Sequence, residues 1–167
     1  MIYFVVAQHN DARPIIEYYG LKRDMAPCPF PIFLADGVAL CLSDNGRANA
    51  AAATAYLLSR WGRDGVFVHL SPSLGLRQEL LYPHTITDGT DRVYQEMLYK
   101  APCNVKEGCI EDGQALYAYM AAWRFLPLKQ IIVLQGKIDE GVFLWLELIC
   151  KMSFPTFIWK KGPQIIP

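Results

Sequence analysis

Three apolar segments of this sequence resemble β-strands, and each is followed at once by polar side chains. The residues at these ends that could take part in chemistry are a histidine, two hydroxyls and two carboxylates, namely His9, Asp11, Ser71, Ser73 and Asp139. In open α/β sheets, ligands bind outside the carboxyl ends of the strands. If the three strands are neighbours, two carboxylates and a hydroxyl-rich turn meet in one crevice.

The two carboxylates also have a simpler interpretation. Asp is a preferred residue at helix N-termini, so Asp11 would only cap a helix and Asp139 would only start the next one. Spacing alone favours this structural role. Carboxyl groups held in a crevice are also what general acid–base catalysis uses, so both interpretations stay open.

The elements that must position these residues alternate between strands and helices. The apolar patterns predict strands within 2–7, 31–42, 66–70, 80–89, 130–141 and 154–159, and helices within 10–20, 45–62, 114–126 and 142–152. The segment 31–42 is expected to hold two short strands around Asp36-Gly37. This order predicts an α/β fold: a three-layer sandwich with a mixed, mostly parallel sheet flanked by helices. We expect a single domain spanning 1–167.

Several local signals refine these helices. In the first helix we expect Asn10 or Asp11 as the N-cap, Pro14 in the first turn and Gly20 as the stop. The last helix, from Val142, is apolar enough to be buried. In the helix within 114–126, large side chains at helical spacing predict a buried stripe, made of Leu116, Tyr119, Met120 and Trp123, with Tyr117 and Phe125 as further core aromatics.

Composition limits the function classes. Hydrophobic residues make up 53% of the 167 residues and charged residues 19%, which excludes a disordered chain. The 16 basic and 16 acidic residues give zero net charge, which argues against a nucleic-acid binder and favours self-association, for instance as a homodimer. No segment is long and apolar enough to span a bilayer, so we expect no membrane partner.

Cysteine and histidine spacing gives no metal motif. The five cysteines form no CxxC pair and the three histidines form no HExxH-like motif. An odd number of cysteines and an apolar N-terminus without a basic leader favour reduced thiols in the cytoplasm. The cysteines are expected to be small buried residues, and no metal or cofactor is expected.

The turn DNGRANA, at 44–50, precedes a predicted helix and could hold an anion at the helix N-terminus. An ordinary capped turn is the favoured interpretation. The turn matches neither GxxxxGK[ST] nor GxGxxG, so no motif supports a nucleoside triphosphatase or a dinucleotide-binding protein.

Four stretches resemble the nucleoside phosphorylase and nucleosidase family, particularly its 5′-methylthioadenosine/S-adenosylhomocysteine nucleosidase branch. VVAQHNDARPII resembles the family's first strand and acidic turn, and SDNGRANAAAATAYLL resembles its S-G-x-G-K-x-N-A-A-x-A motif. PHTITDGTDRVYQEMLY is similar to T-D-x-x-T-G-R-x-F-Y-P-D-M-L. EDGQALYAYMAAWRFLPLKQIIVLQGKID resembles the stretch that holds the V-D-M-E-A and S-D motifs. Because the four stretches occur in the family's order, the chain resembles a short and divergent member of this family.

This resemblance implies a phosphorylase/hydrolase-like fold and cleavage of the bond between a purine and ribose. A carboxylic acid that protonates the departing base removes its negative charge. By resemblance Asp139 is that acid, Asp11 lies near the group that positions the attacking water, and Gln114 takes the place of the ribose-binding Glu. We expect Gln114, with His9, Ser71 and Ser73, to bind the substrate, a small purine nucleoside.

Three departures from the family pattern weaken the enzymatic interpretation. Gln114 brings no negative charge to face an oxocarbenium ion, a loss that could amount to several kcal/mol of transition-state stabilisation. Pro72 removes an amide donor in the turn after the middle strand. Ile138 replaces the Ser before the catalytic Asp.

Three functional readings therefore stand. The first is a nucleosidase or phosphorylase acting on a methylthioadenosine- or adenosylhomocysteine-like nucleoside, with hydrolysis favoured because the phosphate-binding signals are poor. The second is a catalytically impaired member that binds a nucleoside or a protein partner. The third is an interaction module without a small ligand.

Overall fold

The computed structural model describes residues 1–61, 64–71, 79–82, 96, 100–102, 104–107, 110, 112–136 and 138–153. Over these residues, eight strands form one sheet in the order β2-β3-β4-β1-β5-β8-β6-β7. Their bounds are β1 (Ile2–Val6), β2 (Lys22–Arg23), β3 (Ile32–Ala35), β4 (Val38–Leu42), β5 (Val66–Ser71), β6 (Glu79–Tyr82), β7 (Asn104–Glu107) and β8 (Ile131–Gln135). The neighbours β4, β1, β5 and β8 are all parallel, whereas β3 and β6 pair antiparallel with β4 and β8. The predicted mixed, mostly parallel sheet is confirmed.

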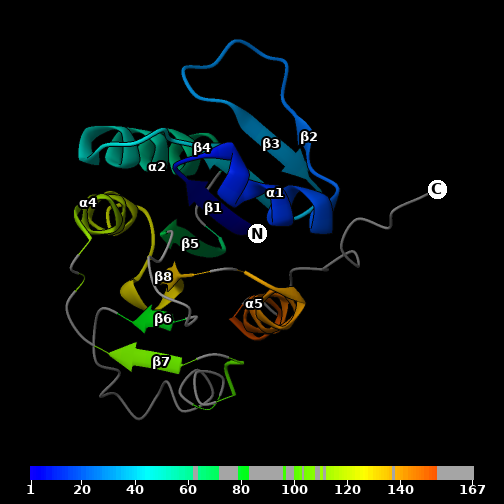
Figure 1. Cartoon of the computed structure of the whole chain (residues 1–167), viewed down its shortest axis with the longest axis vertical. Coiled ribbons are helices and arrows are strands. Elements are labelled where there is room, and N and C mark those ends of the chain that lie inside the picture. The colour runs from blue at the N-terminus through cyan, green and yellow to red at the C-terminus, as the bar shows by residue number, and fades with distance from the viewer. Residues whose placement is uncertain are drawn as a thin grey trace.

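Helices cover both faces of this sheet (Figure 1). One face carries α1 (His9–Tyr19) and α5 (Glu140–Ser153), and the other carries α2 (Arg47–Trp61) and α4 (Gly113–Ala122). A short 3₁₀ helix, η2 (Leu128–Gln130), leads into β8. The predicted three-layer α/β sandwich is confirmed.

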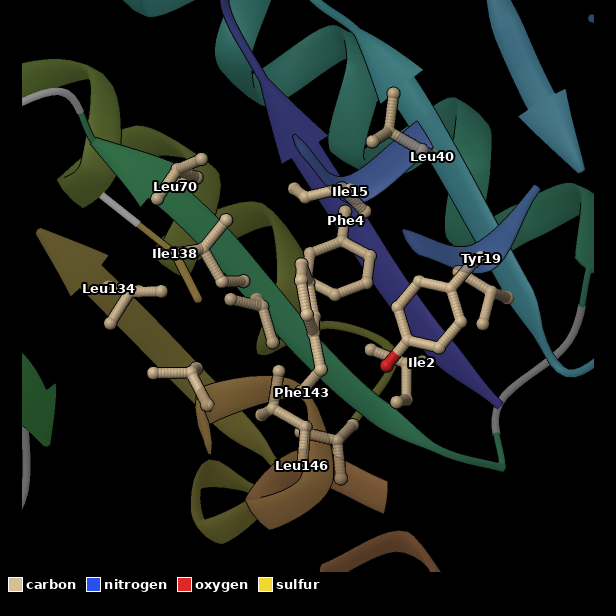
Figure 2. Packing of buried hydrophobic residues seen from close by; sticks show 14 of the residues in the cluster. Ile2, Phe4, Ile15, Tyr19, Leu40, Leu70, Leu134, Ile138, Phe143 and Leu146 are labelled. Atoms are coloured by element: carbon tan, nitrogen blue, oxygen red, sulfur yellow. The ribbon is translucent and has the colours of Figure 1, made fainter. Parts of the chain in front are cut away.

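The face under α1 and α5 is packed with large side chains. Phe4 of β1 lies beside Tyr19 of α1, and Tyr19 meets Phe143 of α5 edge to face (Figure 2). Alternation along each strand sends every second residue to this face, as with Ile2 and Phe4 of β1. The remaining residues of these strands face α2 and α4.

The helices α2 and α4 cover the other face mainly with small side chains. The buried residues of α2 include Ala50 and Ala53, and those of α4 are all alanines, Ala115, Ala118 and Ala122. Small side chains let helices lie close to a sheet and to each other, and α2 and α4 run side by side in the structure.

Several sequence predictions about α4 and α5 were wrong. Leu116, Met120 and Trp123 are exposed rather than buried, as is Tyr117. Tyr119 alone of the predicted stripe packs partly against the core, and Phe125 does likewise. The alanines on the opposite side of α4 form its buried face instead. Likewise α5 is not fully buried, because it presents Leu144 and Leu148 to solvent.

The ends of α1 differ in how well the sequence predicted them. Gly20 ends the helix in the left-handed conformation, with φ of 60°, as predicted. The N-cap is Gln8 rather than Asn10 or Asp11, and Pro14 lies inside the helix. The helix begins earlier than predicted because β1 ends at Val6, so the chain turns directly into it.

Other predictions concern the strands. The hairpin of β3 and β4 around Gly37, which has φ of 78°, is confirmed. The strand β7 was not predicted, because its sequence Asn-Val-Lys-Glu is largely polar. The predicted strand within 154–159 lies outside the described residues. Within the described parts of the chain, every helix is too short or too polar to cross a membrane.

Candidate functional site

The candidate site lies at the carboxyl edge of the parallel strands. A shared crevice needs the strands at 2–7, 66–70 and 131 onwards to be neighbours, and β1, β5 and β8 are adjacent in the sheet. Each of these strands therefore delivers its following residues to the same edge. The turn after β4 reaches it too, since the Ser43 and Asp44 amides donate to the carbonyls of Val6 and Ala7 after β1.

Asp139 lies just before α5 and is exposed. Its Oδ1 accepts a hydrogen bond of 3.1 Å from the backbone N–H of Val142. The carboxylate thus satisfies one of the free amides at the start of α5, which is the structural role that the sequence left open. This geometry still holds Asp139 at the carboxyl end of β8.

Asp11 and His9 lie in the first turn of α1. Asp11 is half-buried and places a carboxylate where the helix dipole favours negative charge. His9 is exposed, and its ring centroid lies 6.1 Å from that of Phe33. Both residues follow the carboxyl end of β1, next to β5.

Gln114 and Ser71 are brought together on the other face of the sheet by Asp112. The Ser71 hydroxyl donates a 2.6 Å hydrogen bond to Oδ2 of Asp112, whose Oδ1 accepts from the backbone N–H of Gln114 at 3.1 Å. Asp112 is the N-cap of α4. Asp112 was not among the predicted site residues, although an Asp at the start of a predicted helix is a recognisable N-cap signal.

His69 adds a second buried polar group beside Ser71. Its Nδ1 lies 3.3 Å from the Ser71 Oγ, and both residues are 2% exposed. Burial lowers the pKa of His69 to about 4, against the opposing effect of the nearby Asp112 carboxylate. The imidazole is therefore neutral at physiological pH.

Arg47 begins α2 and leans toward the start of α4. A Cβ atom at Gly113 would collide with the Arg47 guanidinium, which also lies 5.8 Å from the centroid of the Tyr117 ring. Asp44, with φ of 62°, shapes the turn before α2. The turn at 44–50, for which the sequence favoured an ordinary capped turn over an anion site, thus presents a basic side chain beside the N-terminus of α4.

The structure therefore gathers the predicted residues at one edge but on two sides of the sheet. Asp11 and Asp139 start the helices on one face, and Ser71 and Gln114 lie toward the other. Ser73 lies outside the described residues. A cavity of about 510 Å³ is lined by Arg23 to Pro31, and its lining includes none of the predicted site residues that the structure describes.

Two of the described cysteines, Cys41 and Cys150, are buried in the core. Burial raises the pKa of Cys41 to about 12 and that of Cys150 to about 11, so both behave as the small buried residues that the sequence predicts. Over the part of the chain that the structure describes, no group of three or more His, Cys, Asp or Glu side chains could hold a metal ion.

Comparison with solved structures identifies the architecture. The fold is similar to that of Arabidopsis thaliana 5′-methylthioadenosine nucleosidase, with a TM-score of 0.56, 12% identity and coverage of 93% of this chain and 91% of that one. The fold is also similar to that of the Streptococcus pneumoniae 5′-methylthioadenosine/S-adenosylhomocysteine nucleosidase in complex with 8-aminoadenine. The TM-score is 0.56 at 9% identity, over 93% of this chain and 94% of that one. The corresponding Helicobacter pylori nucleosidase has a TM-score of 0.53 at 13% identity, over 91% of this chain and 93% of that one.

This chain has the fold of the 5′-methylthioadenosine/S-adenosylhomocysteine nucleosidases. The resemblance stated from the sequence is confirmed at the level of fold. No protein-family model and no curated protein sequence matches the chain. Sequence identities of 9% to 13% show only that the strands and helices are arranged alike. The substrate and the reaction depend on the residues at the site.

Proposed function

We propose that this chain is a nucleosidase that binds a purine nucleoside at the carboxyl edge of its sheet and hydrolyses the N-glycosidic bond. The observation that carries the proposal is the meeting of β1, β5, β8 and the start of α4 at one edge. Asp11 and Asp139 follow β1 and β8 there, and Gln114 lies in the first turn of α4. The similarity in fold to nucleosidases, one of them in complex with 8-aminoadenine, supports the same reaction class.

Each of the three side chains has a role in this reaction. Asp139, when protonated, donates its proton to the purine as the bond to C1′ breaks, so that the base leaves without negative charge. Asp11 orients the water that attacks C1′. Gln114 donates and accepts hydrogen bonds with the ribose hydroxyls. The substrate class that we propose is a methylthioadenosine- or adenosylhomocysteine-like nucleoside.

A second function is a nucleoside-binding or protein-interaction module without turnover. Two observations favour it: Gln114 stands where the resembling family has a Glu, and the Asp139 carboxylate already accepts the Val142 amide. The exposed large side chains of α4, among them Met120 and Trp123, would suit a protein partner.

The test is release of adenine from methylthioadenosine and from adenosylhomocysteine, measured by chromatography with and without phosphate. We expect release that does not need phosphate. Asp139→Asn should reduce kcat by at least about 100-fold, the usual contribution of a general acid. Because Asn is as good an N-cap as Asp, this variant removes the acid and keeps the start of α5.

The matched control is Asp36→Asn, the same chemical change in the exposed hairpin turn before β4, at the opposite edge of the sheet. It should leave kcat unchanged, because Asn-Gly suits a tight hairpin turn as well as Asp-Gly does. Gln114→Glu should raise kcat/KM by at least about tenfold, because it restores a charge facing the oxocarbenium ion. Saturable nucleoside binding without adenine release would support the nucleoside-binding module. Neither binding nor release would contradict the nucleosidase and favour the protein-interaction module.

A further inference from the structure

A chain of buried and half-buried polar groups connects the centre of the sheet to the first turn of α4. It runs from His69 through Ser71 to Asp112 and ends at the backbone N–H of Gln114. The bond between Ser71 and Asp112 joins residues 41 positions apart in the sequence. It is therefore a tertiary tie between β5 and α4, and not a local turn contact.

The direction of these hydrogen bonds follows from the number of protons available. The Ser71 hydroxyl has one proton, and at 2.6 Å from Oδ2 of Asp112 it is donated to the carboxylate. Toward His69 the Ser71 oxygen can then only accept, so Nδ1 of His69 carries the imidazole proton. Nε2 is left as a bare lone pair, and among the described residues it has no hydrogen-bond partner.

The start of α4 is also held from a second side. Gly113 leaves no space for a Cβ atom because the Arg47 guanidinium of α2 lies against it. The Asp112 carboxylate is tied to β5 through Ser71 on the one side, while α2 packs along α4 on the other. The backbone of Gln114 is therefore fixed relative to the sheet by two separate contacts.

We propose that Ser71 and His69 are positioning residues, which act through Asp112 to hold Gln114 at the carboxyl edge where the ribose binds. The role in ribose binding rests on the proposed function, whereas the tie between β5 and α4 does not. Ser71 thereby acts indirectly, in place of the direct substrate contact that the sequence predicts. Because Nδ1–H of His69 donates to the Ser71 oxygen, the Ser71 hydroxyl proton stays directed at Asp112.

The experiment compares Ser71→Ala with Thr54→Val in the full-length chain. Thr54 is fully buried in α2 and donates a 2.7 Å hydrogen bond to the Ala50 carbonyl. Its variant therefore also removes one buried hydroxyl, but one whose hydrogen bond stays within α2. Amide hydrogen exchange of Gln114, read by NMR, reports the tie directly. We expect Ser71→Ala to speed this exchange roughly tenfold, as suits the loss of one hydrogen bond to a charged group, and Thr54→Val to leave it unchanged.

The nucleoside readout separates positioning from general destabilisation. Ser71→Ala should raise the KM for methylthioadenosine, or the Kd if turnover is absent, by roughly tenfold with little change in kcat. Ser71→Thr, which keeps the hydroxyl, should restore both the exchange rate and the KM. In the ¹⁵N spectrum of the unmodified chain, His69 should carry its proton on Nδ1.

The outcomes distinguish the two proposals. Unchanged Gln114 exchange in Ser71→Ala, or a proton on Nε2 of His69, overturns the positioning role. The positioning role is supported if Gln114 exchange is faster in Ser71→Ala but not in Thr54→Val, and if Ser71→Ala binds the nucleoside more weakly than the wild-type chain does. Faster exchange in a chain that binds no nucleoside supports the tie between β5 and α4 but overturns the proposed function, and with it the role in ribose binding.

Discussion

The helices on the two faces of the sheet bury different side chains. On what we call the aromatic face, α1 and α5 bury large side chains that include the rings of Tyr19, Phe143 and Trp145. On what we call the alanine face, five of the eight buried residues of α2 and α4 are alanines. On the first face, Tyr18 stacks on Phe143 with ring centroids 4.2 Å apart, and Tyr19 meets the same ring edge to face. On the second face, Ala115 and Ala118 let α4 approach β5. The polar chain from β5 to the start of α4 lies on this second face.

The contrast separates the packing that stabilises the fold from the polar groups of the candidate site. Large side chains fill the face under α1 and α5, and these two helices reach the candidate site through their first turns. Small side chains on the other face let α4 come close enough for Ser71 to reach Asp112. We therefore predict that substitutions on the two faces will lower the free energy of unfolding for different reasons.

Removing a ring from the aromatic face should have the largest effect. Phe143→Ala should lower the free energy of unfolding by about 3–5 kcal/mol, because it leaves a cavity among Tyr18 and Tyr19. Urea denaturation measures this loss. The neighbouring Leu144 is 53% exposed, so Leu144→Ala should cost less than about 1 kcal/mol. Equal losses in the two variants would contradict the assignment of α5's buried side.

Acid should weaken the alanine face through His69. The folded-state pKa of about 4 lies below the usual 6.5, so the unfolded chain binds the proton more readily between these values. Stability is therefore unaffected above pH 6.5 and falls as the pH drops, by about 3 kcal/mol near pH 4, at 1.36 kcal/mol for each pKa unit.

The difference between the wild-type chain and His69→Asn isolates this effect from other titrating groups, such as Glu147, whose pKa is raised by burial. Urea denaturation at several pH values should show a shallower loss in the variant. If the free energies of unfolding of the two chains fell in parallel from pH 7 to pH 4, His69 would not be buried as a neutral imidazole.

Enlarging a side chain on the alanine face should have a somewhat smaller effect. Ala118 is fully buried, so Ala118→Leu should cost about 1–3 kcal/mol by forcing α4 away from the sheet. Ala52 of α2 is exposed, and Ala52→Leu should change the unfolding midpoint very little. If Ala118→Leu left the free energy of unfolding unchanged, α4 would not pack closely on β5.

The sequence predicted the layers of this fold well because the strands carry a strong signal. The five buried residues of β1 and those of β8 are continuous apolar runs, which is typical of central parallel strands. The buried side of α4 could not be predicted in the same way. Size and hydrophobicity favoured Met120 and Trp123 as core, but the close approach of α2 selects the alanines, and that approach is a property of the tertiary structure.

The candidate site was predictable in part. The strand ends led to Asp11, Ser71 and Asp139 from the rule that ligands bind at carboxyl edges. The link between Ser71 and Asp112 could not be predicted, because nothing in the sequence says which residue 41 positions away will face a given strand.

The most direct test of a nucleoside site at this edge is a crystal structure of the chain with a non-hydrolysable analogue of methylthioadenosine. We predict that the analogue will lie across the carboxyl ends of β1, β5 and β8, with its ribose hydroxyls bonded to Gln114 and its base beside Asp139. An analogue bound elsewhere, or one that touches neither of these residues, would contradict the account.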